Sequence, residues 1–256
     1  RLEPDLEFSN DPVARDLGER SLRSIHSLSP TRDNAGDLID QFNHPLPANT
    51  YKNGAYDHDH EWFWLQQYFS PYRMVALDHN NNDQIVADFN TGNNPMDLAY
   101  HEGIIYIMWL WNPVLQRYDI EGNNLGNISL QGHRGINGIA VDHERELILA
   151  CEGSGTPHNL NVFTLEGEMV AQVGNVDPLV NNQTFRSIEW VAEHPGGELW
   201  VNTRNTAWQI DIDTNSWDFV GEEAVQSFQT QSNNEYAVIC HDGTNLWVSN
   251  YTNSIL

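Results

Sequence analysis

One phrase recurs along the chain at intervals of about forty residues. Each copy has an apolar stretch, a His at a turn, a second apolar stretch and then a polar loop. The copies lie at 93–112, 136–153, 185–205 and 234–253. Short apolar stretches bounded by Gly, Asn and Asp indicate strands, and a repeat of this period is typical of propellers and solenoids. The repeat therefore predicts an all-β chain folded as a β-propeller.

The unit at 93–130 predicts four strands. Its apolar segments "MDLAY", "IIYIMW", "VLQRYDI" and "LGNISL" are separated by "HEG", "LWNP" and "EGNN". Gly and Asn in these turns supply the positive φ that tight hairpins need. Similar strands follow at 136–175 and 185–221, and residues 55–90 fit less cleanly. In the unit at 185–221 the fourth strand is predicted at "WDFVG" (217–221).

The final unit lacks a fourth strand, because only "SIL" follows its last loop. The segment "DLIDQFN" at 37–43 resembles "DQIVADFN" at 83–90, which is a predicted fourth strand. Pairing of residues 38–42 with the C-terminal "SIL" would close the ring and remove exposed sheet edges. We therefore predict five four-stranded blades over residues 37–256, with residues 1–36 as an N-terminal arm or linker. A sixth blade built from that arm is the alternative.

The repeat resembles the NHL and YncE-like families of β-propeller. The segments that carry the resemblance are "GIAVD" at 138–142, "LWV" at 199–201 and 246–248, the later Asn205 and Asn253, and "IDIDTN" at 210–215. The resemblance implies a propeller fold over most of residues 38–256 and a habit of binding across one face. It does not imply a particular activity.

Charge sets a second constraint. The chain has 36 acidic residues against 12 basic ones, a formal net charge of −24, and Lys52 is the only lysine. Such a chain repels itself less as ions screen it, so we expect adaptation to high salt. A soluble acidic extracellular protein from a moderate environment is the alternative. The charge argues against nucleic acid and against anionic lipid as partners.

Other features favour an extracellular or cell- or virion-surface location. No apolar run reaches the roughly 18–20 residues of a membrane span, so no membrane insertion is expected. The chain begins at Arg1 without Met, which indicates a removed leader or a fragment of a longer chain. Cys151 and Cys240 end apolar stretches of non-adjacent repeats and are predicted to be buried thiols. Sequons that predict a glycoprotein lie at Asn127, Asn182 and Asn250.

A His stands at the turn between the first two strands of each unit. These residues are His58 or His60, His101, His143, His194 and His241. On sheet-packing spacings, turns of neighbouring blades should stand roughly 10 Å or more apart, whereas zinc needs its nitrogen ligands at about 2.0–2.1 Å. We therefore predict a repeated structural turn rather than a metal ring. For "YDHDHEW" at 56–62 alone, a metal or pH-sensing role stays open.

Propeller ligands usually lie on the face formed by the loops between second and third strands and by the links between blades. Aromatic rings suit the apolar faces of sugars, and amides and Arg suit hydroxyls. The predicted ligand-binding residues are Trp64, Trp109, Trp111, Asn112, His133, Arg134, His158, Arg186, Arg204, Asn205 and Tyr251. The alternative is that these loops are polar only because loops usually are.

Three oxygen-bearing side chains lie at or just after the end of a second strand and should ring the mouth of the central channel. They are Glu152, Asn202 and Asn250. They resemble the calcium site of lactonase-type propellers, although that family's N-terminal Glu motif is missing. No Ser-His-Asp arrangement or nucleophile elbow is present. The segment 211–222 has the spacing of a calcium loop but is expected to form an outer hairpin turn, because Ser216 replaces the required Gly.

The predicted function is an extracellular module that binds a small polar ligand, a glycan or a protein through the Trp/Tyr/Asn/Arg-rich loop face. No catalytic residue is assigned. One alternative is a calcium-dependent, lactonase-like hydrolase or lyase at the channel mouth. Another is a structural component of a surface or virion assembly, in which the arm binds a neighbour. The sequence does not identify the ligand or the oligomeric state.

Overall fold

The structure is a computed structural model that describes residues 51–109, 112–133, 135–152, 157–183, 185–230 and 238–249. Contacts divide the chain into two units, residues 1–37 and 38–256. The predicted arm and the predicted closing strands at 38–42 and 254–256 lie outside the described residues.

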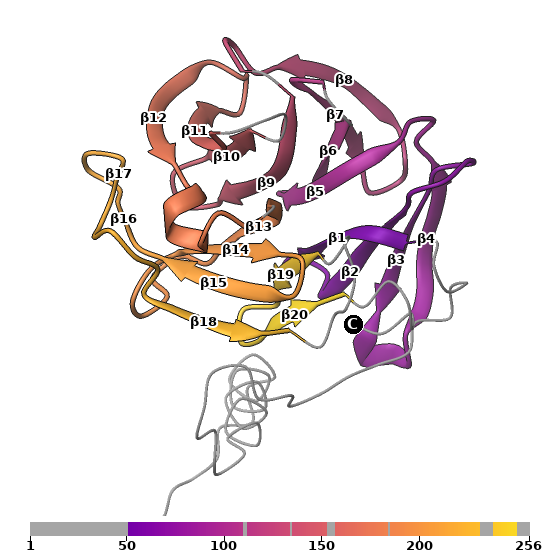
Figure 1. Cartoon of the computed structure of the whole chain (residues 1–256). Helices are drawn as coiled ribbons and strands as arrows, with labels where there is room; N and C mark the ends of the chain where they lie inside the picture. Colours follow the sequence, from indigo (N-terminus) through magenta and orange to yellow (C-terminus); the bar gives the residue numbers. More distant parts are fainter. Residues whose placement is uncertain are drawn as a thin grey trace, which may run out of the picture. The chain divides into compact units, whose positions relative to one another are not determined.

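Four antiparallel sheets of four strands follow one another along the second unit (Figure 1). The first sheet contains β1 (Tyr51–Asp57), β2 (Trp62–Gln67), β3 (Arg73–Asp78) and β4 (Gln84–Asn90). The second contains β5 (Pro95–His101), β6 (Ile104–Trp109), β7 (Val114–Asp119) and β8 (Asn124–Ser129). The third contains β9 (Ile136–Asp142), β10 (Leu147–Glu152), β11 (Asn159–Thr164) and β12 (Met169–Asn175). In these three sheets the strands pair in sequence order, as consecutive hairpins.

Burial changes from the second strand of each sheet to the fourth. The middle residues of β2, β6 and β10 are buried on both faces, whereas most residues of β4 and β8 are exposed or half-buried. A strand between two neighbouring sheets must be apolar on both faces, whereas a strand at the rim contacts solvent. This gradient explains why the second strands are the most apolar segments of the repeat.

The fourth sheet departs from the predicted pattern. It contains β13 (Phe185–Trp190), β14 (Leu199–Thr203), β15 (Thr206–Ile210) and β18 (Gln226–Gln229). The predicted fourth strand at 217–221 is wrong, because those residues belong to a small hairpin of β16 (Ile212–Asp213) and β17 (Asp218–Phe219). Instead, β18 pairs with β15, and Gln226 Nε2 donates to Gln209 Oε1 at 2.6 Å. Phe228 of β18 packs against Trp200, with ring centroids 5.7 Å apart.

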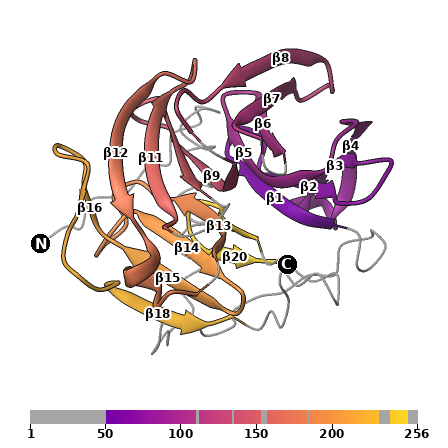
Figure 2. The same cartoon turned by 45° about the horizontal axis from the view of Figure 1, so that its top comes forward.

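A fifth sheet contains only two described strands, β19 (Ile239–His241) and β20 (Leu246–Val248). The prediction of five four-stranded blades is therefore not met within the described part of the chain, where four complete sheets and one pair are found. The first strand of each sheet is the innermost, and β19 contacts both β13 and β1. Figure 2 shows the sheets arranged around a common centre.

Apolar clusters fill the interfaces between consecutive sheets. The largest one joins Leu149 and Val162 of the third sheet to Ile188 and Trp208 of the fourth. Cys240 and Trp247 of the fifth sheet pack with Phe63, Leu65, Val75 and Leu77 of the first. The two cysteines are buried and free, as predicted.

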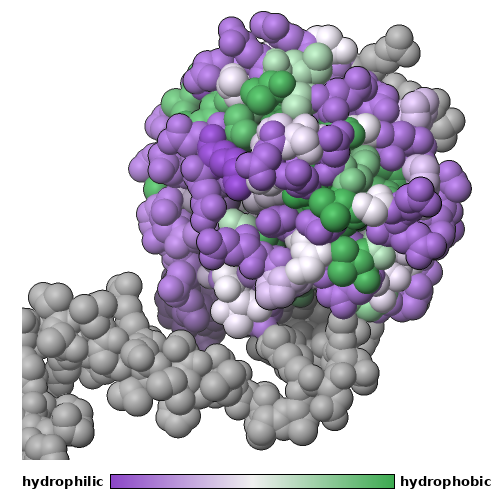
Figure 3. All heavy atoms as spheres, turned by 90° about the vertical axis from the view of Figure 1, so that its left-hand side faces the viewer, coloured by the Kyte–Doolittle hydropathy of each residue, from purple (hydrophilic) through white to green (hydrophobic). Residues whose placement is uncertain are grey.

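On the outer surface, apolar side chains are interspersed with hydrophilic ones. Figure 3 shows this mixture on the side that carries β12 and the β16–β17 hairpin. Met169, Val170, Val220 and Val225 are each about half exposed. Among the described residues, no helix has the length and apolar character required to cross a membrane.

Candidate functional site

A buried carboxyl group at the centre of the ring ties several sheets together. Asp97 of β5 is 0% exposed and accepts the backbone N–H of Ile139 in β9 at 3.0 Å. Ser187 Oγ of β13 donates to Asp97 at 3.3 Å and accepts the N–H of Ile239 in β19 at 3.4 Å. Inner strands leave one edge without a paired strand, and these bonds satisfy part of that edge. Asp97 and Ser187 thus link the second, third, fourth and fifth sheets.

Glu189, two residues after Ser187 in β13, brings a second carboxyl group to this region. Burial raises the pKa of both Asp97 and Glu189, and the mutual repulsion of the two carboxylates raises the pKa of Glu189 further. The hydrogen bonds from Ile139 and Ser187 act in the opposite direction on Asp97. Protonation of these groups is therefore coupled to the integrity of the inner strands.

The histidines of the repeated turn gather at one end of the ring. We refer to His58, His101, His143, His194 and His241 as the histidine mouth. Nδ1 of His101 lies 2.9 Å from Nδ1 of His143, and their ring centroids are 5.1 Å apart. The ring of His58 is 5.4 Å from that of His143, and the rings of His194 and His241 are 6.3 Å apart.

The expected separation of neighbouring histidines is therefore wrong. The roughly 10 Å spacing applies to sheets packed face to face, whereas here the inner strands converge at their ends. His101 and His241 are the last residues of β5 and β19, and His143 directly follows β9. Side chains at these positions meet near the axis rather than between sheet faces.

Aspartates shape three of the turns. Asp57 Oδ1 accepts the backbone N–H groups of Asp59 and His60 at 2.9 and 3.0 Å. Asp142 and Asp242 make the same kind of bond to the residues two and three positions later. This local bonding ends the inner strand and starts the hairpin. The structural turn predicted at these histidines is thus present, and the histidines also cluster.

Four histidines of this mouth, His58, His143, His194 and His241, have a lowered pKa, which favours the neutral ring. Burial, together with repulsion from neighbouring histidines, lowers the pKa of His143 and of His241 to about 4. Burial also lowers the pKa of His58 and His194, against the opposing effect of nearby carboxylates. The hydrogen bond between His101 and His143 requires one protonated and one unprotonated Nδ1, so it cannot survive protonation of both rings.

A metal ion has no ready site in the histidine mouth. Across the residues that the structure describes, no group of three or more His, Cys, Asp or Glu side chains is arranged to hold one. In the "YDHDHEW" segment, His60 Nδ1 pairs with Asp57 at 2.9 Å, and Asp59 accepts a hydrogen bond from the Tyr100 hydroxyl of β5 at 2.6 Å.

The other end of the same inner strands carries a second polar group. Glu152, the last residue of β10, pairs with the first residue of β9, whereas His143 follows the last. Glu152 Oε2 accepts Asn159 Nδ2 at 2.9 Å, and its Oε1 lies 3.7 Å from His133 Nδ1. Asn161 donates to that same Nδ1 at 2.8 Å. We refer to Glu152, His133, Asn159 and Asn161 as the Glu152 cluster.

His133 leaves the hydrogen bonding of this cluster incomplete. Because Nδ1 accepts from Asn161, the proton of the neutral ring lies on Nε2. His133 Nε2 is buried and has no hydrogen-bond partner. Burial lowers the pKa of His133, and Glu152 opposes this shift. A buried N–H without a partner costs about 1–3 kcal/mol, so the cluster is suited to accept a further hydrogen-bonding group.

A second buried pair includes His158, which immediately precedes β11. His158 Nδ1 lies 2.5 Å from Asp177 Oδ1, and the backbone N–H of His158 donates to Asp177 Oδ2 at 3.2 Å. Asp177 opens a short 3₁₀ helix, η2 (Asp177–Val180), that leads to the fourth sheet. His158 is therefore engaged in positioning this link.

Two predicted ligand-binding residues, His133 and His158, and the predicted metal ligand Glu152 thus lie in one region of the third sheet. Trp64 does not belong to a binding face: it is 0% exposed in the middle of β2 and packs between the first and second sheets. Its prediction is wrong because the residue belongs to the buried strand, not to the loop after it. Trp111, Arg134 and Tyr251 lie outside the described residues.

The remaining predicted residues are spread around the ring. Trp109 is half-buried and donates to Gln116 Oε1 at 3.1 Å, and Asn112 follows in the same loop. Arg186 is half-buried near the start of β13. Arg204 and Asn205 are exposed in the loop between β14 and β15.

The predicted calcium ligands are only partly described. Glu152 is engaged by Asn159, Asn202 is 0% exposed in β14, and Asn250 lies outside the described residues. A calcium site at these three residues stays a prediction. The 211–222 segment forms the β16–β17 hairpin, in which Asp213 Oδ1 accepts the N–H of Asn215 at 2.9 Å, in agreement with the predicted outer turn.

Comparison with known proteins identifies the fold. No protein-family model matches the chain, and no curated protein matches its sequence. Among solved structures, the glutaminyl cyclase of Myxococcus xanthus matches with a TM-score of 0.61 at 13% identity, over 85% of this chain and 92% of that one. A chain of the nidogen/laminin complex matches with a TM-score of 0.53 at 13% identity, over 80% and 73%. Hydrazine synthase of Kuenenia stuttgartiensis matches with a TM-score of 0.52 at 11% identity, over 80% and 82%.

The chain is a β-propeller. The glutaminyl cyclase and the nidogen/laminin chain are β-propeller proteins, and their likeness to this chain extends over most of its length. At these identities the likeness concerns the fold alone. It does not single out the NHL or YncE-like families.

Proposed function

We propose that this protein is a ligand-binding β-propeller and that the Glu152 cluster is the centre of its site. The observation that carries the proposal is the unpartnered, buried Nε2 of His133, whose other ring nitrogen lies 3.7 Å from the 17% exposed side chain of Glu152. A ligand that bonds to both groups must accept a hydrogen bond from one and donate to the other. A hydroxyl group does both, so the favoured ligand is a small polyhydroxylated molecule such as a sugar.

The proposal is tested with a panel of free mono- and disaccharides, observed by saturation-transfer NMR with the purified protein. We expect at least one sugar to bind, and Glu152→Gln and His133→Gln each to weaken binding tenfold or more. Glu168→Gln, an exposed acidic residue in the β11–β12 turn at the far end of the same sheet, is the matched control. Binding that is lost equally in the control, or kept in both cluster variants, would reject the site.

A second candidate is enzymatic. A Glu and a His within 3.7 Å of each other can exchange protons with a substrate, and a glutaminyl cyclase shares the fold. One form of this candidate is the calcium-dependent hydrolase or lyase predicted from sequence. It requires one bound calcium per chain, which elemental analysis of the purified protein would detect; a metal-free preparation would remove it.

The proposal also takes β19–β20 as the inner half of a fifth blade, completed by residues 38–42 and 254–256. In support, Trp247 packs on Phe63 of the first sheet with ring centroids 5.2 Å apart, so the pair already lies between two sheets. Deletion of residues 37–43 should lower the melting temperature by several degrees; an unchanged melting temperature would count against this blade. An extracellular location stays part of the proposal and is supported by the three sequons.

A further inference from the structure

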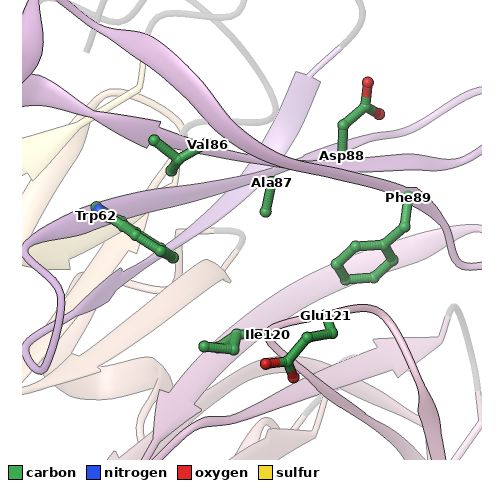
Figure 4. Close-up of a pocket in the computed structure, with 7 residues that line it drawn as sticks. All are labelled: Trp62, Val86, Ala87, Asp88, Phe89, Ile120 and Glu121. Carbon is green, nitrogen blue, oxygen red and sulfur yellow. The ribbon is translucent and has the colours of Figure 1, made fainter.

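A groove of about 400 Å³ lies at the rim of the ring, between the first and second sheets (Figure 4). Its lining combines Trp62 at the start of β2, residues Val86 to Phe89 of β4, and Ile120 and Glu121 just after β7. In Figure 4 the rings of Trp62 and Phe89 and the side chain of Ile120 point toward a common space. The groove shares no residue with the Glu152 cluster.

The aromatic walls of the groove are held by their neighbours. The ring of Trp62 stacks on His60, with centroids 4.6 Å apart and an interplanar angle of 26°. Phe89 lies 5.7 Å from Tyr118 and 6.0 Å from Trp64. Both walls are therefore fixed by ring packing before any ligand arrives.

The acidic side of the groove is equally constrained. Asp119 Oδ1 accepts the backbone N–H of Glu121 at 3.1 Å and of Asn123 at 2.7 Å, which closes a tight turn. Within it, Gly122 has φ +87°, and a Cβ atom there would lie 2.5 Å from Phe89 Cγ. Only glycine allows this close approach, so the turn sets Glu121 beside the aromatic wall.

The two carboxylates of the groove differ in charge compensation. Asp88 forms a salt bridge with Arg73 and points away from Phe89 in Figure 4. Glu121 is exposed and forms no ion pair with any residue that the structure describes. One negative charge therefore stays uncompensated next to a Trp and a Phe.

We propose that this groove binds an alkylammonium group, either a small quaternary amine or the side chain of a Lys from a partner protein. An ammonium ion is attracted to the faces of Trp and Phe and by the carboxylate, while its methyl or methylene groups pack on Ile120 and Val86. Anions are excluded by Glu121 and by the net charge of −24.

The test follows the indole Nε1–H resonance of Trp62 by NMR during titration with tetramethylammonium chloride, against sodium chloride at equal ionic strength. The resonance that disappears in Trp62→Leu assigns the signal. We expect a saturable shift with a dissociation constant on the order of 1–10 mM. Glu121→Gln should weaken binding at least fivefold, and Glu102→Gln, an exposed acid in the β5–β6 turn, should leave it unchanged.

Glu121→Gln alters only an exposed side chain, so the folded protein remains available even if Trp62→Leu does not fold. Acetyl-lysine methylamide, with a free side-chain ammonium, distinguishes the two sources of the cation. Tighter binding of this compound than of tetramethylammonium would indicate a partner's Lys, and the reverse would indicate a quaternary amine. A shift equal to that with sodium chloride, or an affinity unchanged in Glu121→Gln, would overturn the proposal.

Discussion

Asp97 contributes more to this fold than its position in an apolar strand indicates. The side chain lies within "MDLAY", where the strand pattern favours an apolar residue, yet it is fully buried. Its oxygens bond to a backbone amide of one neighbouring sheet and to a Ser hydroxyl of the next. A polar residue in a core strand is stable there only because those partners are present.

Replacement of Asp97 by Ala should lower the free energy of unfolding by about 3 kcal/mol, because Ile139 N–H and Ser187 Oγ lose their acceptor. Asp97→Asn keeps one acceptor oxygen and should cost roughly half as much. Urea unfolding followed by Trp fluorescence measures both variants. Equal effects of the two substitutions would contradict the hydrogen-bonding role.

Sequence reasoning found some members of the sites and missed others for identifiable reasons. His133 and Glu152 were predicted in separate sets, and the structure places them 3.7 Å apart. Asp97 was missed because a single acid in an apolar strand gives no spacing signal. The signal for the histidine mouth was present in the repeat, but its interpretation depended on how closely the inner strands converge.

At the scale of strands, the pattern of apolar residues and the turn residues between them predicted the position of most strands. The predicted "IIYIMW" coincides with β6, because apolar residues on both faces are typical of a strand between two sheets. β1 was not predicted, since "YKNGAYD" contains Gly, Asn and Lys and shows little periodicity. β18 was missed because "WDFVG" is the more apolar candidate, and only tertiary pairing with β15 decides between them.

The turns that carry the histidine mouth make stability depend on pH. The pKa of His143 is about 4 in the folded protein and near 6.5 when unfolded. Between these values the unfolded chain binds a proton that the folded protein does not, so stability falls as pH falls from 6.5 toward 4. Asp97 and Glu189 act in the opposite sense, because their raised pKa favours the protonated, folded form as pH falls.

We therefore expect His143→Asn to lose less stability than the wild type over this pH range, by on the order of 1 kcal/mol or less, because His143 is exposed and solvent screens part of the effect. The comparison of variant with wild type removes the contribution of Asp97 and Glu189, which both proteins share. Thermal melting at pH 6.5, 5.5 and 4.5 provides the measurement. Parallel pH profiles would show that protonation of His143 is not coupled to folding.

At the scale of the whole molecule, charge rather than packing sets the response to solvent. A net charge of −24 on 256 residues produces repulsion that the apolar interfaces between sheets must overcome. The exposed acids are screened by salt, whereas the buried centre of the ring is not. Added salt is therefore expected to change the contribution of surface charge to stability without changing the packing between sheets.

Raising sodium chloride from 0.1 to 2 M should increase the melting temperature by on the order of 10 °C, because screening weakens the repulsion. Sucrose at matched osmolality should have a smaller effect, since it does not screen charge. A melting temperature that is independent of salt, or that rises equally in sucrose, would argue against adaptation to salt.

The histidine mouth also shows what ring closure does to a repeated sequence. Along the chain, the histidines are distant from one another, and each belongs to a separate turn. In the folded ring these histidines lie close together, and neighbouring histidines lower the pKa of His143 and His241. The same substitution made in every unit would therefore change one whole end of the ring at once. Repetition of a single residue in sequence thus sets the chemical character of that end.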